Sequence, residues 1–568
     1  MSQLTGAQAI VSCLLEEGVT TIFGYPGGAV IDLYDELMNS EKLEHILVRH
    51  EQAAVHAADG YARVTGKVGV ALLTSGPGAT NGVTGIATAY MDSIPVVILT
   101  GQVPTPLIGN DAFQEVDIVG ITRPCTKHNY LVGSKDELVQ TLREAFHVAR
   151  TGRPGPVLVD LPKNIINGLI TYEPPQPIKM DSYQPNTEPH PGQIGKACRM
   201  IMEARKPVLY VGGGVILANG HEELAELATK LDIPVTMTLM GLGAFPGNHP
   251  LSMGMLGMHG TYTANMAVAK CDLLISVGAR FDDRVTGNLE SFAPHAKIIH
   301  IDIDPTSISK NVHVDVPIVA DCKRGLEAMN TWFNNQQDIS VAQEKGKHQQ
   351  WFDKIKTWSD AHPLGYIDDN DSSIKPQYVV EMLDKLTGGD AIITTEVGQH
   401  QMWAAQFYKF KWPRHFLTSG GLGTMGYGLP AAIGAKIAMP EKTVIDVAGD
   451  GSIQMNIQEL ATARQYNTAV KIAILNNKYL GMVRQWQELF YDKRYASTGM
   501  DVAPDFVELA KAYGAVGLRA KTKDEVVPVI KEALATDNTV VMDFNIIREE
   551  GVFPMVPAGK ANTEMLLV

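Results

Sequence analysis

The sequence predicts an α/β protein of three doubly wound domains, each built around a parallel sheet. Apolar runs of strand length recur along the chain, many end in a glycine-containing turn, and a helical segment follows the turn. The 568 residues provide for several domains of about 150 residues each. Because 45% of the residues are hydrophobic and 19% are charged, the chain can fill large cores, and extensive disorder is not expected.

Two segments without hydrophobic periodicity divide the chain. Residues 172–192 are rich in Pro and polar side chains, and residues 336–373 are rich in Gln, Asp and Lys, with a part that is compatible with a surface helix. We therefore expect domains at residues 1–171, 193–335 and 374–568, all of ordinary domain size.

In the first block, an apolar strand at residues 70–74 leads into Ser75-Gly76-Pro77-Gly78, a helix, and a second strand at residues 95–99. Earlier, Glu51 follows the apolar residues 46–48 and precedes a helix of small residues. Taken alone, this context favours a carboxylate that stabilises a helix N-terminus through the helix dipole.

The middle block opens with a strand at residues 207–211, followed by Gly212-Gly213-Gly214 and a helix at residues 221–231. Further strands are expected at residues 273–278 and 298–304. A glycine turn after one strand and acidic residues at the end of another are compatible with a nucleotide-binding domain. Both features are also common in α/β folds that bind no nucleotide.

The most informative pattern lies in the third block. One apolar run ends in Gly449-Asp450-Gly451-Ser452, and the next apolar run ends in Asn476-Asn477, with Asp450 and Asn477 27 positions apart. A right-handed β-α-β crossover would bring both strand ends to one sheet edge. Carboxylate and amide oxygens suit Mg²⁺, and a helix N-terminus beside them would bind phosphate. The pattern thus predicts a Mg²⁺-diphosphate site, with a tight turn plus an Asn-Asn loop as the alternative.

Composition argues against several partners and locations. The formal net charge is −14, which disfavours nucleic acid and anionic membranes as partners. Five scattered cysteines without a Cys-x-x-Cys pair favour a reducing cytosol. Residues 1–7 lack a secretory signal, and no apolar stretch reaches bilayer length. We expect a cytoplasmic protein.

Gly421-x-Gly423-x-x-Gly426 matches the dinucleotide fingerprint, but a lone match is weak evidence. The small-residue segment that follows, residues 427–432, favours close helix packing and cofactor contact. A nicotinamide dehydrogenase would also leave the Asp450 and Asn477 pair unexplained.

The Gly-Asp-Gly and Asn-Asn spacing resembles that of thiamine diphosphate enzymes. Across almost the whole chain, the motifs closely resemble the catalytic large subunit of acetohydroxyacid synthases, also called acetolactate synthases. The segment Arg280-Phe281-Asp282-Asp283-Arg284 resembles the biosynthetic, FAD-containing type. The other motifs that carry the resemblance are residues 23–29, 49–51, 74–81, 152–157, 397–401, 423–426 and 482–487.

This resemblance implies three cofactors: thiamine diphosphate, Mg²⁺ and FAD. The first domain would bind the pyrimidine, the central domain FAD, and the third domain the diphosphate and Mg²⁺, with a C-terminal lid. Asp450, Asn477 and the carbonyl of Tyr479 would hold the metal. Glu51 would activate the cofactor by bonding to its aminopyrimidine ring and promoting the imino tautomer.

The resemblance implies further roles, each with an ordinary structural alternative such as a core Met, a turn glycine, an interface Trp or a surface ion pair. Met425 would bend the cofactor, Gly28 would offer a backbone N–H near the reacting carbon, and Trp486 would form one wall of the acceptor pocket. Arg280 would bind the acceptor's carboxylate. The remaining implied contacts are Phe113, Gln114 and Lys163 in the substrate pocket; Gln399, His400, Gly423, Gly449, Gly451 and Ser452 at the cofactor; and Arg153, Gly212, Gly213, Arg280, Asp302 and Asp321 at FAD.

The implied reaction is decarboxylation of pyruvate and carboligation to a second 2-oxo acid, pyruvate or 2-oxobutanoate. Its product is 2-acetolactate or 2-aceto-2-hydroxybutanoate, at the first common step of branched-chain amino-acid synthesis. FAD would undergo no net redox change. A homodimer at least and a separate small regulatory subunit are implied as partners.

The competing interpretations are a catabolic acetolactate synthase, a pyruvate oxidase, a 2-oxo-acid decarboxylase and a non-catalytic nucleotide-binding protein. Two positions depart from the family pattern, Asn164 and Glu396, and neither carries a proposed role.

Overall fold

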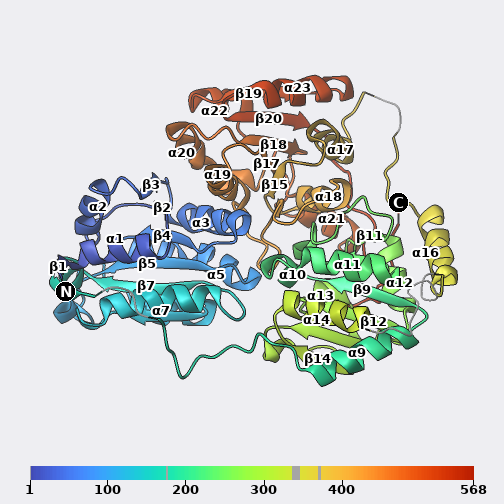
Figure 1. Ribbon diagram of the computed structural model, residues 1–568. Coiled ribbons are helices and arrows are strands. Elements are labelled where there is room, and N and C mark those ends of the chain that lie inside the picture. The colour runs from blue at the N-terminus through green and yellow to red at the C-terminus, as the bar shows by residue number, and fades with distance from the viewer. Residues whose placement is uncertain (1, 174–176, 336–345, 369–371, 568) are drawn as a thin grey trace.

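The computed structural model describes residues 2–173, 177–335, 346–368 and 372–567. Three six-stranded sheets organise the molecule, and every strand pair within them is parallel. In Figure 1 the first sheet lies at the left in blue, the second at the lower right in green, and the third at the top in orange. The predicted fold class is therefore confirmed.

The first sheet has the strand order β3-β2-β4-β5-β7-β6. Its central strands are buried on both faces, as expected for a parallel sheet covered by helices on each side. Alternate residues of these strands face two separate apolar clusters, one beneath α1, α2 and α7 and the other beneath α3 and α5. The strands are β2 Thr21–Gly24, β3 Glu44–Leu47, β4 Gly69–Leu73, β5 Val96–Gln102, β6 His128–Leu131 and β7 Val157–Pro162; the helices are α1 Gly6–Glu16, α2 Ile31–Met38, α3 Glu51–Thr65, α4 Pro77–Asn81, α5 Val83–Asp92, α6 Ile118–Thr122, α7 Leu138–Arg150 and α8 Lys163–Ile166, with 3-10 turns η1 Thr105–Leu107 and η2 Arg123–Cys125.

Local sequence explains several of these boundaries. A capping box between Thr5 and Gln8 starts α1, and Gly66 ends α3 in the left-handed conformation at φ +70°. A small antiparallel pair, β1 Ser2–Thr5 with β8 Leu169–Tyr172, joins the two ends of the block. Because β8 ends at Tyr172, it extends one residue beyond the predicted domain boundary.

The second sheet has the order β11-β10-β9-β12-β13-β14. The predicted strand at 207–211 and helix at 221–231 are confirmed with the same bounds. Helices α9, α11 and α14 cover one face, and α12 and α16 cover the other. The strands are β9 Pro207–Val211, β10 Val235–Met237, β11 Ser252–Met255, β12 Leu273–Val277, β13 Lys297–Asp302 and β14 Val316–Val319; the helices are α9 Pro191–Glu203, α10 Gly213–Leu217, α11 His221–Leu231, α12 Tyr262–Lys270, α13 Asp283–Thr286, α14 Cys322–Asn334 and α16 Gln349–Ala361, with 3-10 turns η3 Leu239–Gly241, η4 Leu289–Ser291 and η5 Pro305–Ser307.

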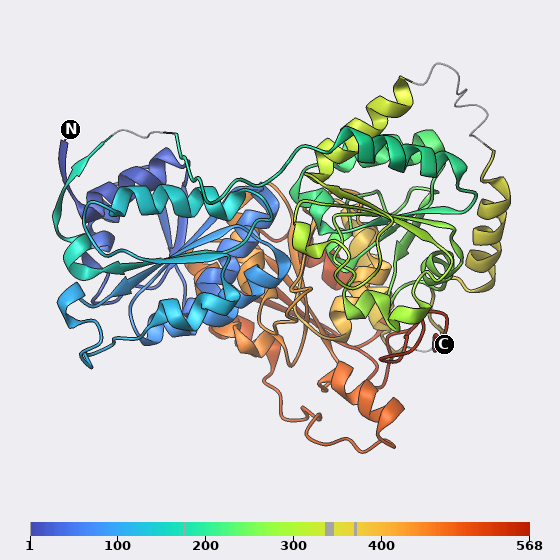
Figure 2. The same ribbon diagram turned by 90° about the horizontal axis from the view of Figure 1, so that it is seen from below.

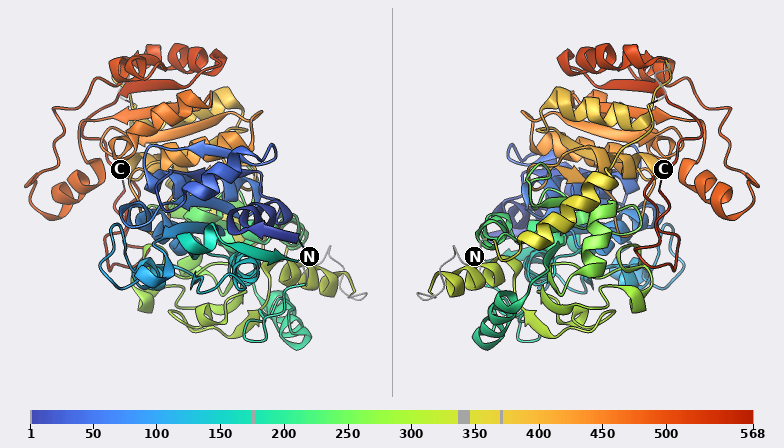
Figure 3. Two further views of the ribbon diagram at one scale, coloured as in Figure 1. Left: turned by 90° about the vertical axis from the view of Figure 1, so that its left-hand side faces the viewer. Right: turned by 90° about the vertical axis from the view of Figure 1, so that its right-hand side faces the viewer.

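The third sheet has the order β16-β15-β17-β18-β20-β19. The expected helix does not begin directly after the Gly-Asp-Gly turn, and this prediction is corrected. The 3-10 turns η6 Ile453–Met455 and η7 Ile457–Glu459 come first, and the helix α20 Leu460–Gln465 follows them. Helix α21 and the loop after it stand out from the body of the molecule (orange in Figures 2 and 3). The other elements are β15 Ile392–Thr395, β16 Phe416–Leu417, β17 Val444–Gly449, β18 Lys471–Asn476, β19 Val516–Ala520, β20 Val540–Asn545, α17 Pro376–Thr387, α18 Gln399–Phe407, α19 Gly428–Ala438, α21 Gly481–Phe490, α22 Phe506–Ala512 and α23 Lys523–Ala535.

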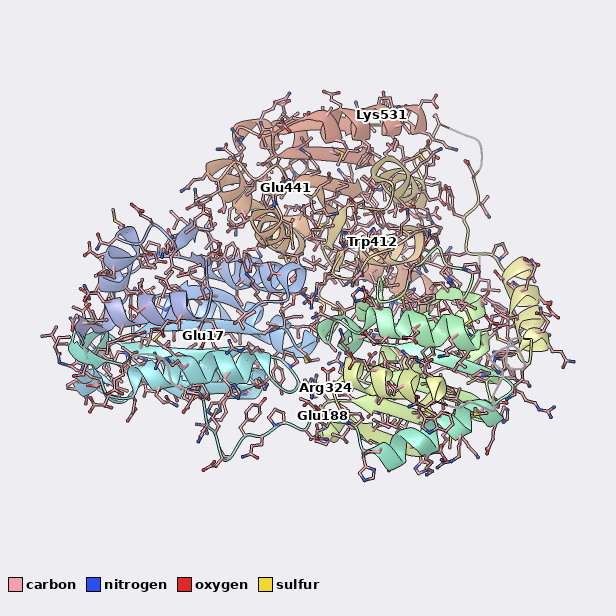
Figure 4. The ribbon with its side chains drawn as sticks, in the orientation of Figure 1. Glu17, Glu188, Arg324, Trp412, Glu441 and Lys531 are labelled. Atoms are coloured by element: carbon pink, nitrogen blue, oxygen red, sulfur yellow. The ribbon has the colours of Figure 1, made fainter. Side chains whose placement is uncertain are left out.

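The two predicted linkers have different outcomes. Residues 177–190 contain no helix or strand, and Glu188 there pairs with Arg324 at the start of α14, where Figure 4 shows the two side chains together. The second segment contains α16, the surface helix that the sequence allowed, while residues 336–345 and 369–371 lie outside the described part of the chain. Within that described part, no helix combines the length and the apolarity needed to span a membrane.

The first and third domains pack directly against each other. Helices α3 and α19 cross so closely that a Cβ on Gly434 would lie 2.0 Å from the carbonyl oxygen of Ala57. At the same contact, a Cβ on Gly60 would lie 2.3 Å from the carbonyl oxygen of Ala431. Only glycine permits such a backbone approach, so these two positions fix the helix crossing.

Candidate active site

Most predicted site residues of the third domain follow the carboxyl ends of its strands. Gln399 and His400 follow β15, Met425 follows β16, Asp450 follows β17 and Asn477 follows β18. Strands β17 and β18 pair in parallel register, which brings their ends to one edge as the crossover argument predicted. The backbone at Asn477 lies close enough to the Asp450 carboxyl to lower its pKa.

The Asp450 carboxylate is suited to bind a cation. Its side chain is 1% exposed, and its Oδ2 has no hydrogen-bond partner. Burial raises the pKa of this carboxyl to about 7, although backbone N–H groups oppose the shift. A buried oxygen without a partner is costly unless something neutralises it, so the donor set at this edge fits a hard cation.

The turn after β18 supplies two more oxygens. Asn477 Oδ1 accepts the Tyr479 N–H at 3.0 Å, and Lys478 between them adopts φ +57°. Residues 478 and 480 pair with residues 498–500, and this pairing does not use the Tyr479 carbonyl. The described residues contain no group of three or more His, Cys, Asp or Glu side chains suited to a metal. A site with one carboxylate suits Mg²⁺, which takes its remaining ligands from water and phosphates.

His400 lies against the Gly-Asp-Gly turn. A Cβ on Gly449 would lie 2.6 Å from His400 Nδ1, so glycine is required there for the ring to fit. Burial lowers the pKa of His400 to about 3, which keeps the imidazole neutral, and its buried Nε2 has no hydrogen-bond partner. A neutral ring nitrogen of this kind can donate a hydrogen bond to a phosphate oxygen.

Ser452 is tied to the loop that carries Met425. Its hydroxyl donates to Glu396 Oε2 at 2.8 Å and accepts the Val397 N–H at 3.2 Å. Glu396 also accepts the N–H groups of Gly426 at 2.6 Å and Leu429 at 3.2 Å. Because the Ser452 hydroxyl is already used, the backbone at Ser452 is better placed than its side chain to contact a diphosphate.

The predicted site residues of the first domain also follow strand ends. Glu51 begins α3, is half-buried, and accepts a hydrogen bond from Asn81 Nδ2 at 2.9 Å. Lys163 follows β7 and donates to the carbonyl oxygen of Gly28 at 2.9 Å. A Cβ on Gly28 would meet nothing within 4 Å, so the space beside it is open in a single chain.

Phe113 and Gln114 lie on the loop after β5. The Phe113 side chain is 88% exposed. Gln114 adopts φ +57°, and its backbone packs against Gly76. Among the described residues, no hydrogen bond or ion pair joins Glu51, Phe113 or Gln114 to the Asp450 edge of the same chain.

A cleft between the first and second domains contains most of the predicted FAD residues. It opens to solvent and has about 840 Å³ of empty space, including its mouth. Arg153, Gly213, Arg280, Asp302 and Asp321 line it. Gly212 does not line the cleft: a Cβ there would lie 2.1 Å from the carbonyl oxygen of Gly278, so this glycine serves close packing.

The two arginines of the Arg-Phe-Asp-Asp-Arg segment have different neighbours. Arg280 donates to the carbonyl oxygen of Met91 at 2.7 Å inside the cleft. Arg284 instead lies over the Trp486 ring, with 5.9 Å from its guanidinium carbon to the ring centroid. Among the described residues, no hydrogen bond or cation–π interaction joins Arg280 to Trp486, so their shared role at an acceptor stays a prediction.

The Gly-x-Gly-x-x-Gly segment is not a free phosphate-binding loop. Gly420 and Gly421 donate their N–H groups to Asp92 at 3.1 and 2.7 Å. Asp92 in turn pairs with Arg63 at 2.9 Å in a buried network with Asp59. Since these N–H groups are already used, the interpretation as close packing next to a cofactor is favoured over a nicotinamide site.

Comparisons with known proteins agree with this geometry. Models of thiamine pyrophosphate enzymes match the chain in three places: the N-terminal TPP binding domain at residues 4–121, the central domain at 194–329 and the C-terminal TPP binding domain at 396–544. The acetolactate synthase large subunit of Buchnera aphidicola subsp. Schizaphis graminum is 52% identical over 100% of this chain and 99% of its own length. This chain belongs to the acetolactate synthase large-subunit family.

Two other members of the acetolactate synthase family are equally similar. The isozyme 3 large subunit of Escherichia coli K12 is 52% identical over 100% of this chain and 99% of its own length. The large subunit IlvB1 of Mycobacterium tuberculosis is 52% identical over 100% of this chain and 92% of its own length. Glu51 lies in the N-terminal TPP-binding region, and Asp450 and Asn477 lie in the C-terminal one.

Local sequence patterns assign no role to some residues that hold the candidate site together, namely Glu396, Gln485 and Asp92. All three are buried polar side chains that bond to segments distant in sequence. The available signal was weak: a polar residue at a position that the surrounding pattern makes buried.

Proposed function

We propose that the protein is the catalytic subunit of an acetohydroxyacid synthase that uses thiamine diphosphate, Mg²⁺ and FAD. It would decarboxylate pyruvate and join the remaining two-carbon unit to pyruvate or 2-oxobutanoate. The observation that carries this proposal is the buried, partnerless Asp450 Oδ2 beside Asn477, in a chain of this family. The biosynthetic rather than the catabolic type is favoured by the Arg280–Arg284 segment and by the cleft between the first two domains.

Residues at the carboxyl edge of the third sheet would hold the metal and the diphosphate. Asp450, Asn477 Oδ1 and the Tyr479 carbonyl would bind Mg²⁺, and the neutral His400 Nε2 would donate to a phosphate oxygen. Met425 would support the bent cofactor, since its loop is held by Glu396 through the Gly426 N–H. When bound, thiamine diphosphate supplies the carbon nucleophile and the electron sink that decarboxylation requires.

Glu51 would exchange a proton with the aminopyrimidine ring. Asn81 already donates to its Oε2, which leaves Oε1 beside Gly78 as the atom for this exchange. The Asn81 contact also fixes the orientation of the carboxylate, which general acid–base catalysis requires.

The acceptor would lie between charged and aromatic side chains. Arg280 would bind its carboxylate, because a planar guanidinium matches a carboxylate with two hydrogen bonds. Trp486 would contact its alkyl group, and the extra methylene of 2-oxobutanoate would be worth about 1–3 kcal/mol in such a pocket. Lys163, Phe113 and Gln114 would complete the pocket from the first domain.

FAD would occupy the cleft between the first and second domains. Arg153 is 35% exposed on its side chain and lines the cleft, so it could reach a phosphate, while the Gly213 backbone could approach closely. Carboligation with loss of CO₂ involves no net oxidation, so the flavin would not be reduced in turnover. A pyruvate oxidase, in contrast, would reduce its flavin.

Under this assignment, a second copy of the chain would complete the site. Glu51 and Asp450 belong to different domains, and no described hydrogen bond or ion pair connects them in one chain. The exposed Phe113 and the open space at Gly28 support a surface that a second copy covers. A separate regulatory subunit and a cytoplasmic location also stay predictions.

The decisive experiment is a product assay. Purified protein is incubated with pyruvate, thiamine diphosphate, Mg²⁺ and FAD, and acetolactate, acetaldehyde and acetyl-derived products are measured. We expect acetolactate, dependent on thiamine diphosphate and Mg²⁺, without reduction of the bound flavin at the turnover rate. Acetaldehyde as the main product would indicate a decarboxylase, and flavin reduction would indicate an oxidase. No product even after addition of a regulatory subunit would favour the non-catalytic alternative.

A further inference from the structure

The Gln399 side chain is fully occupied by protein partners. Its Nε2 donates to Gln485 Oε1 at 2.9 Å and to the carbonyl oxygen of Glu550 at 2.9 Å. Its Oε1 accepts from Asn477 Nδ2 at 3.2 Å. Both N–H groups of the amide and its oxygen are therefore engaged, and the side chain is 3% exposed.

The backbone of residues 550–552, called here the C-terminal segment, determines the orientation of this amide. Gln485 Oε1 accepts the Val552 N–H at 2.9 Å, and Gln485 Nε2 donates to the Val552 carbonyl oxygen at 3.0 Å. This two-point contact with the backbone determines which end of the Gln485 amide faces Gln399. Because an amide oxygen accepts and an amide nitrogen donates, Gln399 must turn its nitrogen to Gln485 and its oxygen to Asn477.

We propose that Gln399 and Gln485 are positioning residues that fix which atom of the Asn477 amide is presented to the metal. The inference rests on the proposed metal site at Asp450 and Asn477. With Nδ2 held by Gln399, Asn477 presents Oδ1 at the turn that contains Tyr479. A reversed amide would direct N–H donors at a cation and would leave Gln399 Oε1 facing another oxygen.

The C-terminal segment thus takes part in metal binding without touching the metal. Residues 550 and 552 orient Gln485 and Gln399, and these orient Asn477. Partners that orient metal ligands in this way commonly change metal affinity by about 10- to 100-fold when they are substituted. Loss of Gln399 should have the larger effect, because Glu550 can still orient Gln399 after loss of Gln485.

The test measures binding of Mn²⁺, which accepts the same oxygen ligands as Mg²⁺, by the electron paramagnetic resonance of the free ion. The full-length protein is titrated with thiamine diphosphate present, and no turnover is involved. We expect Gln399→Met to weaken Mn²⁺ binding at least tenfold. The matched control is Gln406→Met. Gln406 lies on the same helix, is similarly buried, and also donates a hydrogen bond near the C-terminus, to the Phe553 carbonyl oxygen. Unlike Gln399, it forms no hydrogen bond with Asn477. Wild-type affinity in Gln399→Met, or an equal loss in Gln406→Met, would overturn the inference.

Two further measurements separate orientation from general damage. Gln485→Met should weaken binding less than Gln399→Met, and the double variant should bind as Gln399→Met does, since both act through Asn477. In an Asn477→Asp background, where both side-chain ends are oxygens, Gln399→Met should cause less than a twofold loss. A full loss in that background would contradict the orientation argument. Asp450→Asn should abolish binding; unchanged binding there would instead remove the metal site itself and the proposed function with it.

Discussion

Gly434→Ala tests whether the crossing of α3 and α19 is fixed by backbone contact. The added Cβ would lie 2.0 Å from the Ala57 carbonyl oxygen and 2.8 Å from its carbonyl carbon. Real Cβ contacts essentially never fall below 3.0 Å, and both neighbours are backbone atoms that cannot turn away. The helices must therefore separate by about 1 Å, which also displaces the neighbouring contact of Gly60.

The expected magnitude follows from two opposing effects. In a helix without this contact, Gly→Ala stabilises by about 0.5–1 kcal/mol because the unfolded chain loses freedom. Overpacking in a well-packed interior costs about 1–3 kcal/mol and occasionally more. At a backbone contact as short as this one we expect the upper part of that range, so the net change should be destabilising by roughly 1–2 kcal/mol.

The assay is thermal unfolding of the full chain. For a cooperative unit of 150–250 residues, 1 kcal/mol corresponds to about 2–4 °C, so the midpoint should fall by roughly 2–8 °C. Gly195→Ala is the control: Gly195 lies in α9, and its nearest added contact is an Arg199 guanidinium nitrogen at 3.4 Å. Its midpoint should stay unchanged or rise. An unchanged or raised midpoint in Gly434→Ala would refute the argument for helix contact.

Three further outcomes are expected. Glu51→Gln should lower the rate of acetolactate formation at least about 100-fold, the usual worth of general acid–base catalysis, with an unchanged thermal midpoint; a near-normal rate would remove Glu51 from the mechanism. Trp486→Leu should reduce the preference for 2-oxobutanoate over pyruvate, and an unchanged product ratio in competition would exclude that role. Burial raises the pKa of Glu459 from 4.5 to about 7. The protonated carboxyl therefore adds to the free energy of unfolding in full below pH 4.5, and this contribution is lost as the pH rises through 7. Glu459→Gln, neutral at every pH, should therefore gain about 1 kcal/mol relative to the wild type between pH 6 and pH 8; equal thermal-midpoint differences at both pH values would contradict the shift.

The sequence predicted the sheets and their functional edges because both depend on local pattern. Parallel strands buried on both faces read as continuous apolar runs, and the crossover rule then sends every strand end to one edge. For this reason the sequence places Asp450 and Asn477 at neighbouring strand ends although they are 27 positions apart, and the parallel register of β17 and β18 agrees.

Sequence patterns could not predict the partners of buried polar side chains. Gln399 bonds to Gln485 and to residue 550, and Glu396 bonds to Ser452, across separations that no local pattern encodes. The same limit explains the missing helix after Gly-Asp-Gly. Asn456 donates to the Gly426 carbonyl oxygen at 2.7 Å and adopts φ −134°, so a tertiary hydrogen bond interrupts the segment.

The packing between the first and third domains bears on how two copies would form an active site. Glu51 starts α3, and α3 is fixed to α19 of its own chain by Gly60 and Gly434. Just before it, the Arg49 N–H is held by the buried Glu459 at 3.0 Å. Glu51 is thus rigidly placed relative to the third domain of its own chain, and any hinge motion between the two domains would have to break these contacts. If a second copy supplies Asp450, the same rigid contact connects the glutamate of one site to the metal ligands of the other.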